Sequence, residues 1–356
     1  MINDKETYMM RKQLFVLSLM LMAVMAVSAQ KRFKTYAVGF YNQENLFDTI
    51  HDEGKKDADF LPDGKYHWDS NKYNNKLKNM AQALSDMGTT GLPDQGCAVI
   101  GLAEVENARV LNDLIRQPQL KARGYKYVHI EGPDARGIDC AMLYNPSLFT
   151  VESARLYPYV QHLAEEPNFI TRGFLAVNGK LADEPVTIIV CHLPSRFSKA
   201  AYRIQGAEEV KALKDSLQKA DKKRKFFIMG DMNDDPIDSS MHVALQSKEE
   251  ISMVKKHDMY NPWYNILAKD NTGTLLYRGK WNLFDQIILS PNLLPKGKKS
   301  DYKKLTYQRN EIQRMPYLFQ TEGKYAGTLK RTTAGGRWLN GYSDHLPVVV
   351  YLQKKE

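Results

Sequence analysis

Seven apolar runs of strand length are spread along the 356 residues, whereas only two of the intervening segments have helical periodicity. The runs cover residues 36–41, 97–103, 139–144, 186–191, 226–229, 284–289 and 346–352. Two helices are too few to cover every strand in a simple alternating βαβ chain. We therefore predict an α/β or α+β fold in which two mixed β-sheets pack face to face, with helices on the outside.

Two helical segments and one polar segment lie between these runs. Apolar side chains recur at helical spacing in residues 77–87, where Gly88 ends the pattern, and again from about 200 to 219. Residues 51–72 are polar and lack periodicity, so we predict a surface loop there. No linker rich in Pro or Gly divides the chain, which favours one domain.

The N-terminal segment, residues 1–29, differs in character from the rest. Arg11 and Lys12 precede an apolar run that is followed by small residues up to Ala29. This is the pattern of a secretory signal that is cleaved near Ala29, and the run is too short to span a bilayer comfortably. We expect an exported protein, periplasmic or secreted, whose mature chain of residues 30–356 has no transmembrane segment. An N-terminal membrane anchor is the alternative.

The composition excludes a disordered chain and a disulfide scaffold. Hydrophobic residues make up 43% of the chain and charged residues 26%, which is ordinary for a globular protein. Cys97, Cys140 and Cys191 lie in or beside apolar runs, so we predict that they are buried as small apolar side chains. The formal net charge of +9 suits a polyanionic partner, but it is weak support because many lysines lie in surface-like stretches.

Side chains that can bind metals or protons stand at the ends of these runs. Four runs end in such a residue and two begin with one. The residues are Asn42 and then Glu44 in "YAVGFYNQEN", Glu104 in "AVIGLAEVEN", His192 in "TIIVCHLPSR", Asp231 and Asn233 in "FFIMGDMND", Asp285 in "NLFDQIILS", and Asp344 with His345 in "GYSDHLPVVVYL".

Each of these residues alone is explained by a structural role, because Asp and Asn commonly end strands and start turns. If strand directions alternate between the two groups, however, all of them meet at one edge of the sheets. Four carboxylates would then lie close together, which is electrostatically costly without a cation. A hard divalent ion with oxygen ligands would relieve that repulsion.

The complete set of motifs, in this order, resembles the endonuclease/exonuclease/phosphatase superfamily, which includes pancreatic-type deoxyribonuclease, neutral sphingomyelinases and inositol-polyphosphate 5-phosphatases. The resemblance spans residues 36–352, and "GDMND" and "SDHLPV" are its most specific parts. It implies a four-layer α-β-β-α sandwich that presents these loops at one edge. It also implies divalent-metal-dependent hydrolysis of phosphate esters by a single catalytic domain.

The resemblance implies a set of metal ligands. Glu104 would be the principal ligand of Mg²⁺, with Mn²⁺ or Ca²⁺ as alternatives, and Asn42 would assist through its amide oxygen. Asp344 would face the metal or a bound water. Glu44 stands where the family often has an aspartate, so its longer side chain leaves its part in metal binding open.

The resemblance also implies the groups that transfer protons. Asp231 and Asn233 would flank the attacked phosphorus, with the carboxylate orienting or deprotonating water. His345, oriented by Asp285, is the other candidate for the general base. His192 would donate to a phosphoryl oxygen or to the leaving group. The sequence does not decide between Asp231 and His345 as the base.

Four basic residues are candidates for binding phosphate: Arg136, Arg196, Arg278 and Lys280. The planar guanidinium of arginine matches pairs of phosphate oxygens. For each of the four, the alternative is a solvated surface charge or a structural salt bridge.

These inferences favour a metal-dependent phosphodiesterase, in the first place a nuclease of low sequence specificity that acts as a monomer without an obligate protein partner. No base-reading module is recognisable, so contacts with nucleic acid would depend on backbone charge. One alternative is hydrolysis of a lipid phosphoester, sphingomyelin-like, or of a small phosphorylated substrate. The other is a binding protein that retains the scaffold without catalysis.

Overall fold

The computed structural model describes residues 33–356 apart from 161, 165, 168, 271 and 298–301, together with residues 8, 9 and 12. The predicted secretory signal, residues 1–29, lies outside the described residues except for those last three. Within the described part, none of the helices is both long enough and apolar enough to cross a membrane.

The first large sheet has six strands in the order β14-β17-β1-β2-β4-β3. β1 and β2 run parallel, and the other neighbours are antiparallel, so the sheet is mixed. Its strands are β1 (Phe33–Leu46), β2 (Cys97–Val105), β3 (Lys126–His129), β4 (Asp139–Tyr144), β14 (Thr306–Ile312) and β17 (Val348–Lys355).

The second large sheet has seven strands in the order β5-β6-β7-β8-β13-β10-β9, with parallel pairs at β7–β8 and β9–β10. Its strands are β5 (Phe149–Tyr157), β6 (Phe174–Leu181), β7 (Glu184–His192), β8 (Lys225–Asp231), β9 (Ser247–Lys248), β10 (Met259–Tyr260) and β13 (Asp285–Leu289). Two small hairpins pair β11 (Leu275–Tyr277) with β12 (Lys280–Asn282), and β15 (Thr333–Ala334) with β16 (Arg337–Trp338).

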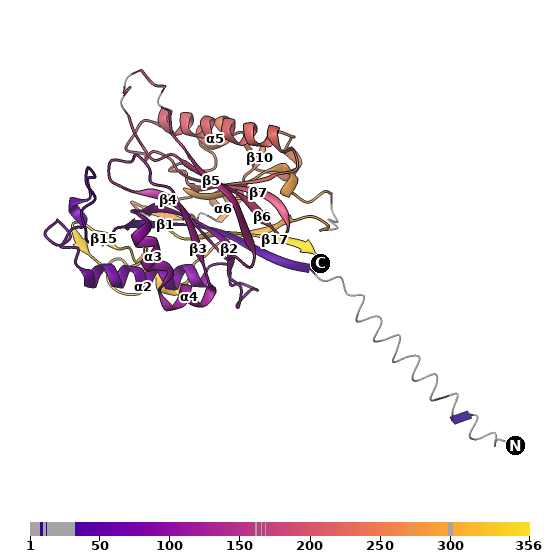
Figure 1. The fold of residues 1–356 in the computed structure, drawn as a ribbon, viewed down its shortest axis with the longest axis horizontal. Helices are drawn as coiled ribbons and strands as arrows, with labels where there is room; N and C mark the ends of the chain where they lie inside the picture. The colour runs from indigo at the N-terminus through magenta and orange to yellow at the C-terminus, as the bar shows by residue number, and fades with distance from the viewer. Residues whose placement is uncertain are drawn as a thin grey trace.

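Helices cover the outer faces of the two sheets (Figure 1). α2 (Ser70–Asp86), α3 (Ala108–Ile115) and α4 (Pro118–Arg123) lie on the six-stranded sheet, and α5 (Ala200–Ala220) lies on the opposite side of the molecule, over the seven-stranded sheet. α6 (Tyr264–Asp270) follows β10. Short turns of helix occur at Ala58–Phe60, Ser240–Ala244, Ile251–Met253, Pro291–Leu293 and Pro316–Leu318. This arrangement confirms the predicted four-layer sandwich with two mixed sheets.

Alternation of side chains along the central strands fills three apolar layers. On β1, Ala37 and Tyr41 pack on the side of α2, whereas Val38 and Phe40 pack between the two sheets. β8 divides its side chains in the same way between the inter-sheet layer and the layer under α5. Strands that are buried on both faces have nearly continuous apolar sequences, which is why these runs were recognisable.

Residues 51–72 differ from the predicted surface loop. Phe60 and Trp68 are buried, with the Phe60 ring stacked on Phe47 at 4.5 Å between centroids. Trp68 Nε1 also donates a hydrogen bond of 3.1 Å to the carbonyl oxygen of Phe47. The prediction of an exposed loop is therefore wrong for this part, because single aromatic residues anchor the segment without any periodic pattern.

The helix predicted at residues 77–87 begins earlier, at Ser70. Asp69 caps it, since the Asp69 side chain accepts a hydrogen bond of 2.9 Å from the backbone nitrogen of Lys72. The first turns of α2 are more polar than the rest, so apolar periodicity alone detects only its C-terminal part.

The three cysteines are free thiols, and each is at most 2% exposed. Burial raises the pKa of the thiols of Cys97, Cys140 and Cys191. This confirms that they serve as buried apolar residues.

Candidate active site

Strand register brings three predicted site residues together on the seven-stranded sheet. In the parallel pair β7–β8, His192 lies opposite Asp231, and in the antiparallel pair β8–β13, Asp231 lies opposite Asp285. All three are at most 4% exposed. We call these residues the β7–β8–β13 edge; regular ladder hydrogen bonds fix their spacing.

The facing edge of the six-stranded sheet is irregular. Asn42 pairs with Ala103 on β2, but both ladders of β2 shift register around Glu104. Glu104 has a left-handed backbone with φ of 61°, which is uncommon for a residue with a side chain. Glu44 shares this conformation, with φ of 46°. We call Asn42, Glu44 and Glu104 the β1–β2 edge.

Glu104 reaches across to the other sheet. One carboxylate oxygen, Oε2, accepts a hydrogen bond of 2.9 Å from the backbone nitrogen of Asn45. The other, Oε1, lies 3.9 Å from His192 Nε2. The two sheet edges therefore meet at one site.

Asp231 is the centre of the cluster. Its Oδ1 accepts from the backbone nitrogen of Asn233 at 2.9 Å, and its Oδ2 accepts from Asn42 Nδ2 at 3.0 Å. Oδ2 also lies 3.5 Å from His192 Nε2 and 3.8 Å from His345 Nε2. Burial raises the pKa of Asp231 to about 7, against the opposing effect of His345.

The surroundings of the two histidines shift their pKa values in opposite directions. Burial would lower the pKa of His345, but Asp285 and Asp231 together raise it well above the usual value. His345 Nδ1 lies 2.7 Å from Asp285 Oδ2, which fixes the ring. In contrast, burial and the nearby Arg172 lower the pKa of His192 well below the usual value. His345 thus favours the cationic form and His192 the neutral one.

The two asparagines of the predicted set direct their amide groups to protein partners. Asn233 Nδ2 donates to the carbonyl oxygen of Leu193 at 3.0 Å. Asn42 Oδ1 accepts from the backbone nitrogen of Glu44 at 2.9 Å, while its Nδ2 holds Asp231. These contacts orient the Asp231 carboxylate.

Arg331 is a site residue that sequence reasoning missed. Its Nε donates to Glu44 Oε1 at 3.2 Å and its Nη2 to Asp344 Oδ2 at 2.8 Å. Glu44 also accepts from the backbone nitrogens of Thr332 at 2.6 Å and Thr333 at 3.3 Å, so both of its oxygens are bound to protein donors. Burial, followed by the Asp344 charge, raises the pKa of Glu44 to about 7. These contacts make Glu44 an anchor for the 331–333 segment, and its part in metal binding stays open.

Arg172 is a second missed residue. Its Nε donates to the carbonyl oxygen of His192 at 3.0 Å, and its Nη2 to that of Leu193 at 3.3 Å. Its Nη1 pairs with Asp134 Oδ2 at 3.1 Å. Arg172 precedes β6 and belongs to no recognisable motif, so only the folded chain reveals its place behind His192.

A cavity of about 500 Å³ opens between the two edges. It is lined by the charged and imidazole groups of Glu104, Asp134, Arg136, Arg172, His192, Asp231, Arg331, Asp344 and His345. Among the four basic residues predicted to bind phosphate, Arg136 is the one in this lining. The arginines of this lining offer donors to phosphate oxygens, and its carboxylates offer oxygen ligands to a cation.

The other three basic candidates have different surroundings. Arg196 pairs with Asp234 at 3.3 Å, Asp235 at 3.0 Å and Asp238 at 2.6 Å. Arg278 is exposed, with its guanidinium 5.3 Å from the ring centre of Tyr277, and Lys280 is exposed on β12. The surroundings of Arg196 match the alternative of a structural salt bridge.

The donor set of the cavity fits a hard divalent cation. Carboxylates of Glu104, Asp231 and Asp344 face one cavity, and anionic oxygens are the ligands that Mg²⁺ prefers. A second group with ligand atoms within 4.8 Å of one another, His129, Glu131 and Asp139, lies outside that lining. There His129 Nε2 is 2.9 Å from Asp139 Oδ2, so these two side chains already bind each other.

The sequence of residues 37–354 matches the model of the Endonuclease/Exonuclease/phosphatase family. The chain belongs to this family, whose members are phosphoric ester hydrolases. The match confirms both the resemblance and the predicted class of enzyme.

Solved structures of other proteins share the fold of this chain. An endonuclease/exonuclease/phosphatase family protein from Bacteroides thetaiotaomicron has 15% identity and a TM-score of 0.55, covering 92% of this chain and 97% of that one. A mannosyl-6-phosphatase from Bacteroides thetaiotaomicron VPI-5482 has 15% identity and a TM-score of 0.53, covering 89% and 99%. TDP2 from D. rerio, complexed with a single-strand DNA product, has 13% identity and a TM-score of 0.52, covering 90% and 99%. No curated protein matches the sequence.

Proposed function

We propose that this protein is an exported, divalent-metal-dependent phosphodiesterase that hydrolyses nucleic-acid phosphodiester bonds with low sequence specificity. One observation carries the proposal: carboxylates, two histidines of opposite charge preference and three arginines line the same cavity. Phosphodiester hydrolysis requires charge neutralisation at the phosphoryl oxygens, a base for water and a donor for the leaving oxygen. The cavity contains a group for each requirement.

Each residue of the cavity has a separate role in the proposed reaction. Arg136 and Arg331 bind nonbridging phosphate oxygens. Asp231, oriented by Asn42 and Asn233, accepts the proton of the attacking water. His345, whose other nitrogen is bound to Asp285, keeps a proton on Nε2 beside the phosphoryl group. The central position of the Asp231 carboxylate favours it over His345 as the base.

His192 supplies a hydrogen bond. In its neutral form it carries the hydrogen on Nε2, because Nε2 faces the carboxylates of Asp231 and Glu104, whereas Nδ1 has no hydrogen-bond partner among the described residues. This N–H donates a hydrogen bond to a phosphoryl oxygen or to the leaving oxygen, and the proton that the leaving oxygen takes up comes from Nε2 of cationic His345. Glu104 and Asp344 would hold Mg²⁺, which supplies neutralisation of phosphoryl charge when bound; Mn²⁺ and Ca²⁺ are the alternatives.

A substrate panel tests the proposal. Plasmid DNA, RNA, sphingomyelin and a phosphorylated sugar are each incubated with the purified protein and Mg²⁺, with and without EDTA. We expect turnover of the nucleic acids that EDTA abolishes. Turnover of none of the diesters, with hydrolysis of the sugar phosphate alone, would contradict the nuclease assignment.

Hydrolysis of a small phosphorylated substrate is the second candidate. The cavity volume of about 500 Å³ is typical of small-molecule sites, which bury most of a compact ligand. The same panel separates this function from the first, because a small ester would be turned over faster than any polymer.

We also propose that residues 1–29 are removed on export, which leaves 30–356 as a monomeric catalytic domain. N-terminal sequencing of protein recovered outside the cytoplasm is expected to begin at Gln30. Gel filtration with light scattering is expected to give the mass of one chain.

A further inference from the structure

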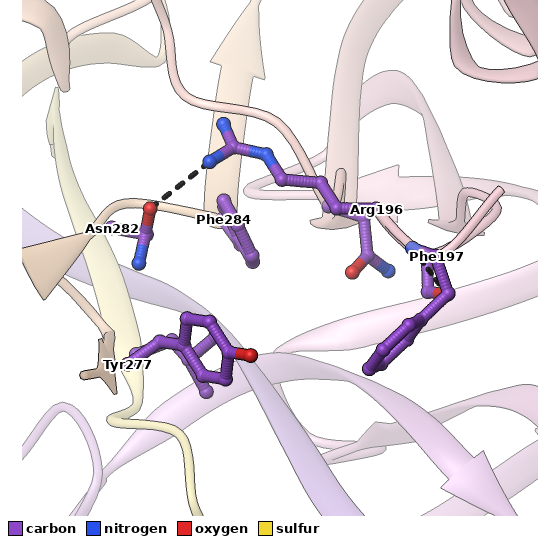
Figure 2. Close-up of a pocket in the computed structure, with 8 residues that line it drawn as sticks. Arg196, Phe197, Tyr277, Asn282 and Phe284 are labelled. Carbon is purple, nitrogen blue, oxygen red and sulfur yellow. Dashed lines mark hydrogen bonds between the residues drawn. The ribbon is translucent and has the colours of Figure 1, made fainter. Parts of the chain in front are cut away.

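A smaller pocket of about 250 Å³ adjoins the catalytic cavity. The two share wall residues, among them Ser195, Asn233 and Leu275, so a single bound molecule is able to extend from one into the other. Figure 2 shows the rings of Phe197, Tyr277 and Phe284 around this smaller space, which we call the aromatic pocket.

The aromatic pocket has an exposed entrance and a buried floor. Phe197 is 97% exposed and Tyr277 53% exposed, whereas Phe284 is 4% exposed. Large aromatic side chains held in water beside a cavity are a feature of ligand-binding surfaces. The three come from separate segments: the loop after β7, the β11–β12 hairpin and the residue directly before β13. Their convergence is therefore a product of the fold.

Ion pairs keep this pocket in place without a ligand. The guanidinium of Arg196 lies 4.5 Å from the ring centre of Phe284 and donates to Asn282 Oδ1 at 3.0 Å (Figure 2). Its charge is balanced by Asp235 and Asp238. The wall is thus rigid and carries no unpaired cation at this point, so it suits an uncharged group of the ligand and not a second phosphate.

Asn282 is one of the polar residues in this largely apolar lining, beside Ser195, Arg196 and Asn233. Asn282 is half-buried, and its Nδ2 donates to none of the residues that the structure describes, while its Oδ1 is occupied by Arg196. A planar heteroaromatic ring offers both flat faces for stacking and edge atoms that accept a hydrogen bond. An alkyl chain offers neither.

From these observations we propose that the aromatic pocket binds a nucleobase of the substrate whose phosphodiester lies in the catalytic cavity. Phe197 and Tyr277 contact the faces of the base, Phe284 forms the floor and Asn282 donates to its edge. Stacking accepts every base, since each has a π face, so the pocket adds affinity without sequence specificity. This inference rests on the proposed function, because it assumes that phosphate occupies the larger cavity.

Two dinucleotides with a single phosphodiester test the proposal: one carries thymine on both sugars and the other carries abasic tetrahydrofuran sugars. We expect kcat/KM of the unchanged protein to favour the thymine substrate roughly 5- to 150-fold, the effect of stacking one base. The double variant Phe197→Ala, Tyr277→Ala is expected to lose that preference and to keep its rate on the abasic substrate within about threefold. Tyr325→Ala removes a tyrosine that is 59% exposed elsewhere on the surface and is expected to change neither rate.

Equal rates of the unchanged protein on both dinucleotides would overturn the proposal, as would an equal loss on both substrates in the double variant. A higher rate on an alkyl phosphodiester than on either dinucleotide would also overturn it and would assign the pocket to a lipid chain.

A binding measurement separates this inference from the proposed function. In the Glu104→Ala background, calorimetry compares thymidine 5′-monophosphate with deoxyribose 5-phosphate, which lacks the base. We expect tighter binding of the nucleotide, with the difference lost in the Phe197→Ala, Tyr277→Ala variant. Base-dependent binding together with no turnover of any phosphodiester would support the pocket and refute the proposed activity. Equal binding of both ligands, together with turnover of nucleic acids by the unchanged protein, would refute the base-binding pocket and support the proposed activity.

Discussion

The two sheet edges around the catalytic cavity place their side chains by different means. On the β7–β8–β13 edge, His192, Asp231 and Asp285 are direct neighbours in an unbroken ladder. On the β1–β2 edge, Glu44 and Glu104 have left-handed backbones and the ladder is interrupted. Regular pairing fixes the first edge through backbone hydrogen bonds, whereas the second depends on side-chain contacts from distant segments.

Those distant contacts come from the 331–333 segment and from α2. Arg331 and the backbone of residues 332 and 333 bind Glu44. Lys76 on α2 in turn donates to Thr332 Oγ1 and to the carbonyl oxygen of Tyr342, both at 2.5 Å. The irregular edge is therefore supported by a chain of polar contacts, and substitutions along that chain are expected to disturb it.

The largest effect is expected on the irregular edge itself. Glu104→Ala removes the carboxylate that would anchor the metal, and we expect kcat/KM to fall by on the order of 10³- to 10⁵-fold, because charge neutralisation at the phosphoryl group supplies several kcal/mol. Steady-state kinetics on the best substrate of the panel measures this. Circular dichroism checks that the variant is folded; a folded variant that keeps most of its rate would remove Glu104 as the anchor.

The next effect concerns the regular edge. His192→Ala is expected to lower kcat by about 10²- to 10³-fold with little change in KM, because a hydrogen-bond donor to the charge that develops on oxygen is lost while the ladder keeps Asp231 in place. The measurement is kcat and KM under saturating Mg²⁺. His257→Ala, a change at an exposed histidine, is the control and should leave both constants unchanged. A defect confined to KM would contradict the role of His192 in stabilising the transition state.

The third effect is on stability and concerns the ion pairs that support the β1–β2 edge. Arg331→Met leaves Glu44 and Asp344 without their shared partner, and we expect the free energy of unfolding to fall by about 2 kcal/mol, less than for a fully buried pair because Arg331 is 41% exposed. Urea denaturation measures it. Adding Glu44→Gln should restore part of the loss, and Arg278→Met, at an exposed arginine, should cost nothing measurable. No recovery in the double variant would show that the two residues are not coupled.

The smallest effect is expected at the N-terminus of α2, behind the irregular edge. Asp69→Ala removes the helix cap and should lower the free energy of unfolding by about 1 kcal/mol. Thermal denaturation, compared with Asp63→Ala at an exposed position in the same segment, tests this prediction. Identical melting temperatures for the two variants would exclude a stabilising role for the cap.

The contrast between the edges also explains what the sequence was able to predict. Strands buried on both faces have continuous apolar sequences, and all seven such runs form strands. β5 and β6 were missed because β5 has many exposed side chains and β6 contains Asn178 and Gly179. Residues at strand ends were visible as candidates because their position follows from the strand itself.

Residues that reach the cavity from loops were not predictable in this way. Arg172 and Arg331 act through tertiary contacts that no local pattern encodes. Arg196 shows the same limit: the sequence left a phosphate ligand and a structural salt bridge as alternatives, and only the fold places its guanidinium beside the carboxylates of Asp234, Asp235 and Asp238. In each case, ion pairs with residues far apart in the sequence determine where the arginine side chain lies.

The burial of all three thiols has a consequence for maturation. With no disulfide among Cys97, Cys140 and Cys191, folding needs neither an oxidant nor a thiol-exchange catalyst. A maleimide reagent is able to reach these sulfur atoms only when the sandwich opens, so the rate of labelling reports how often the native structure unfolds. The same protein is therefore expected to persist unchanged in oxidising and in reducing surroundings.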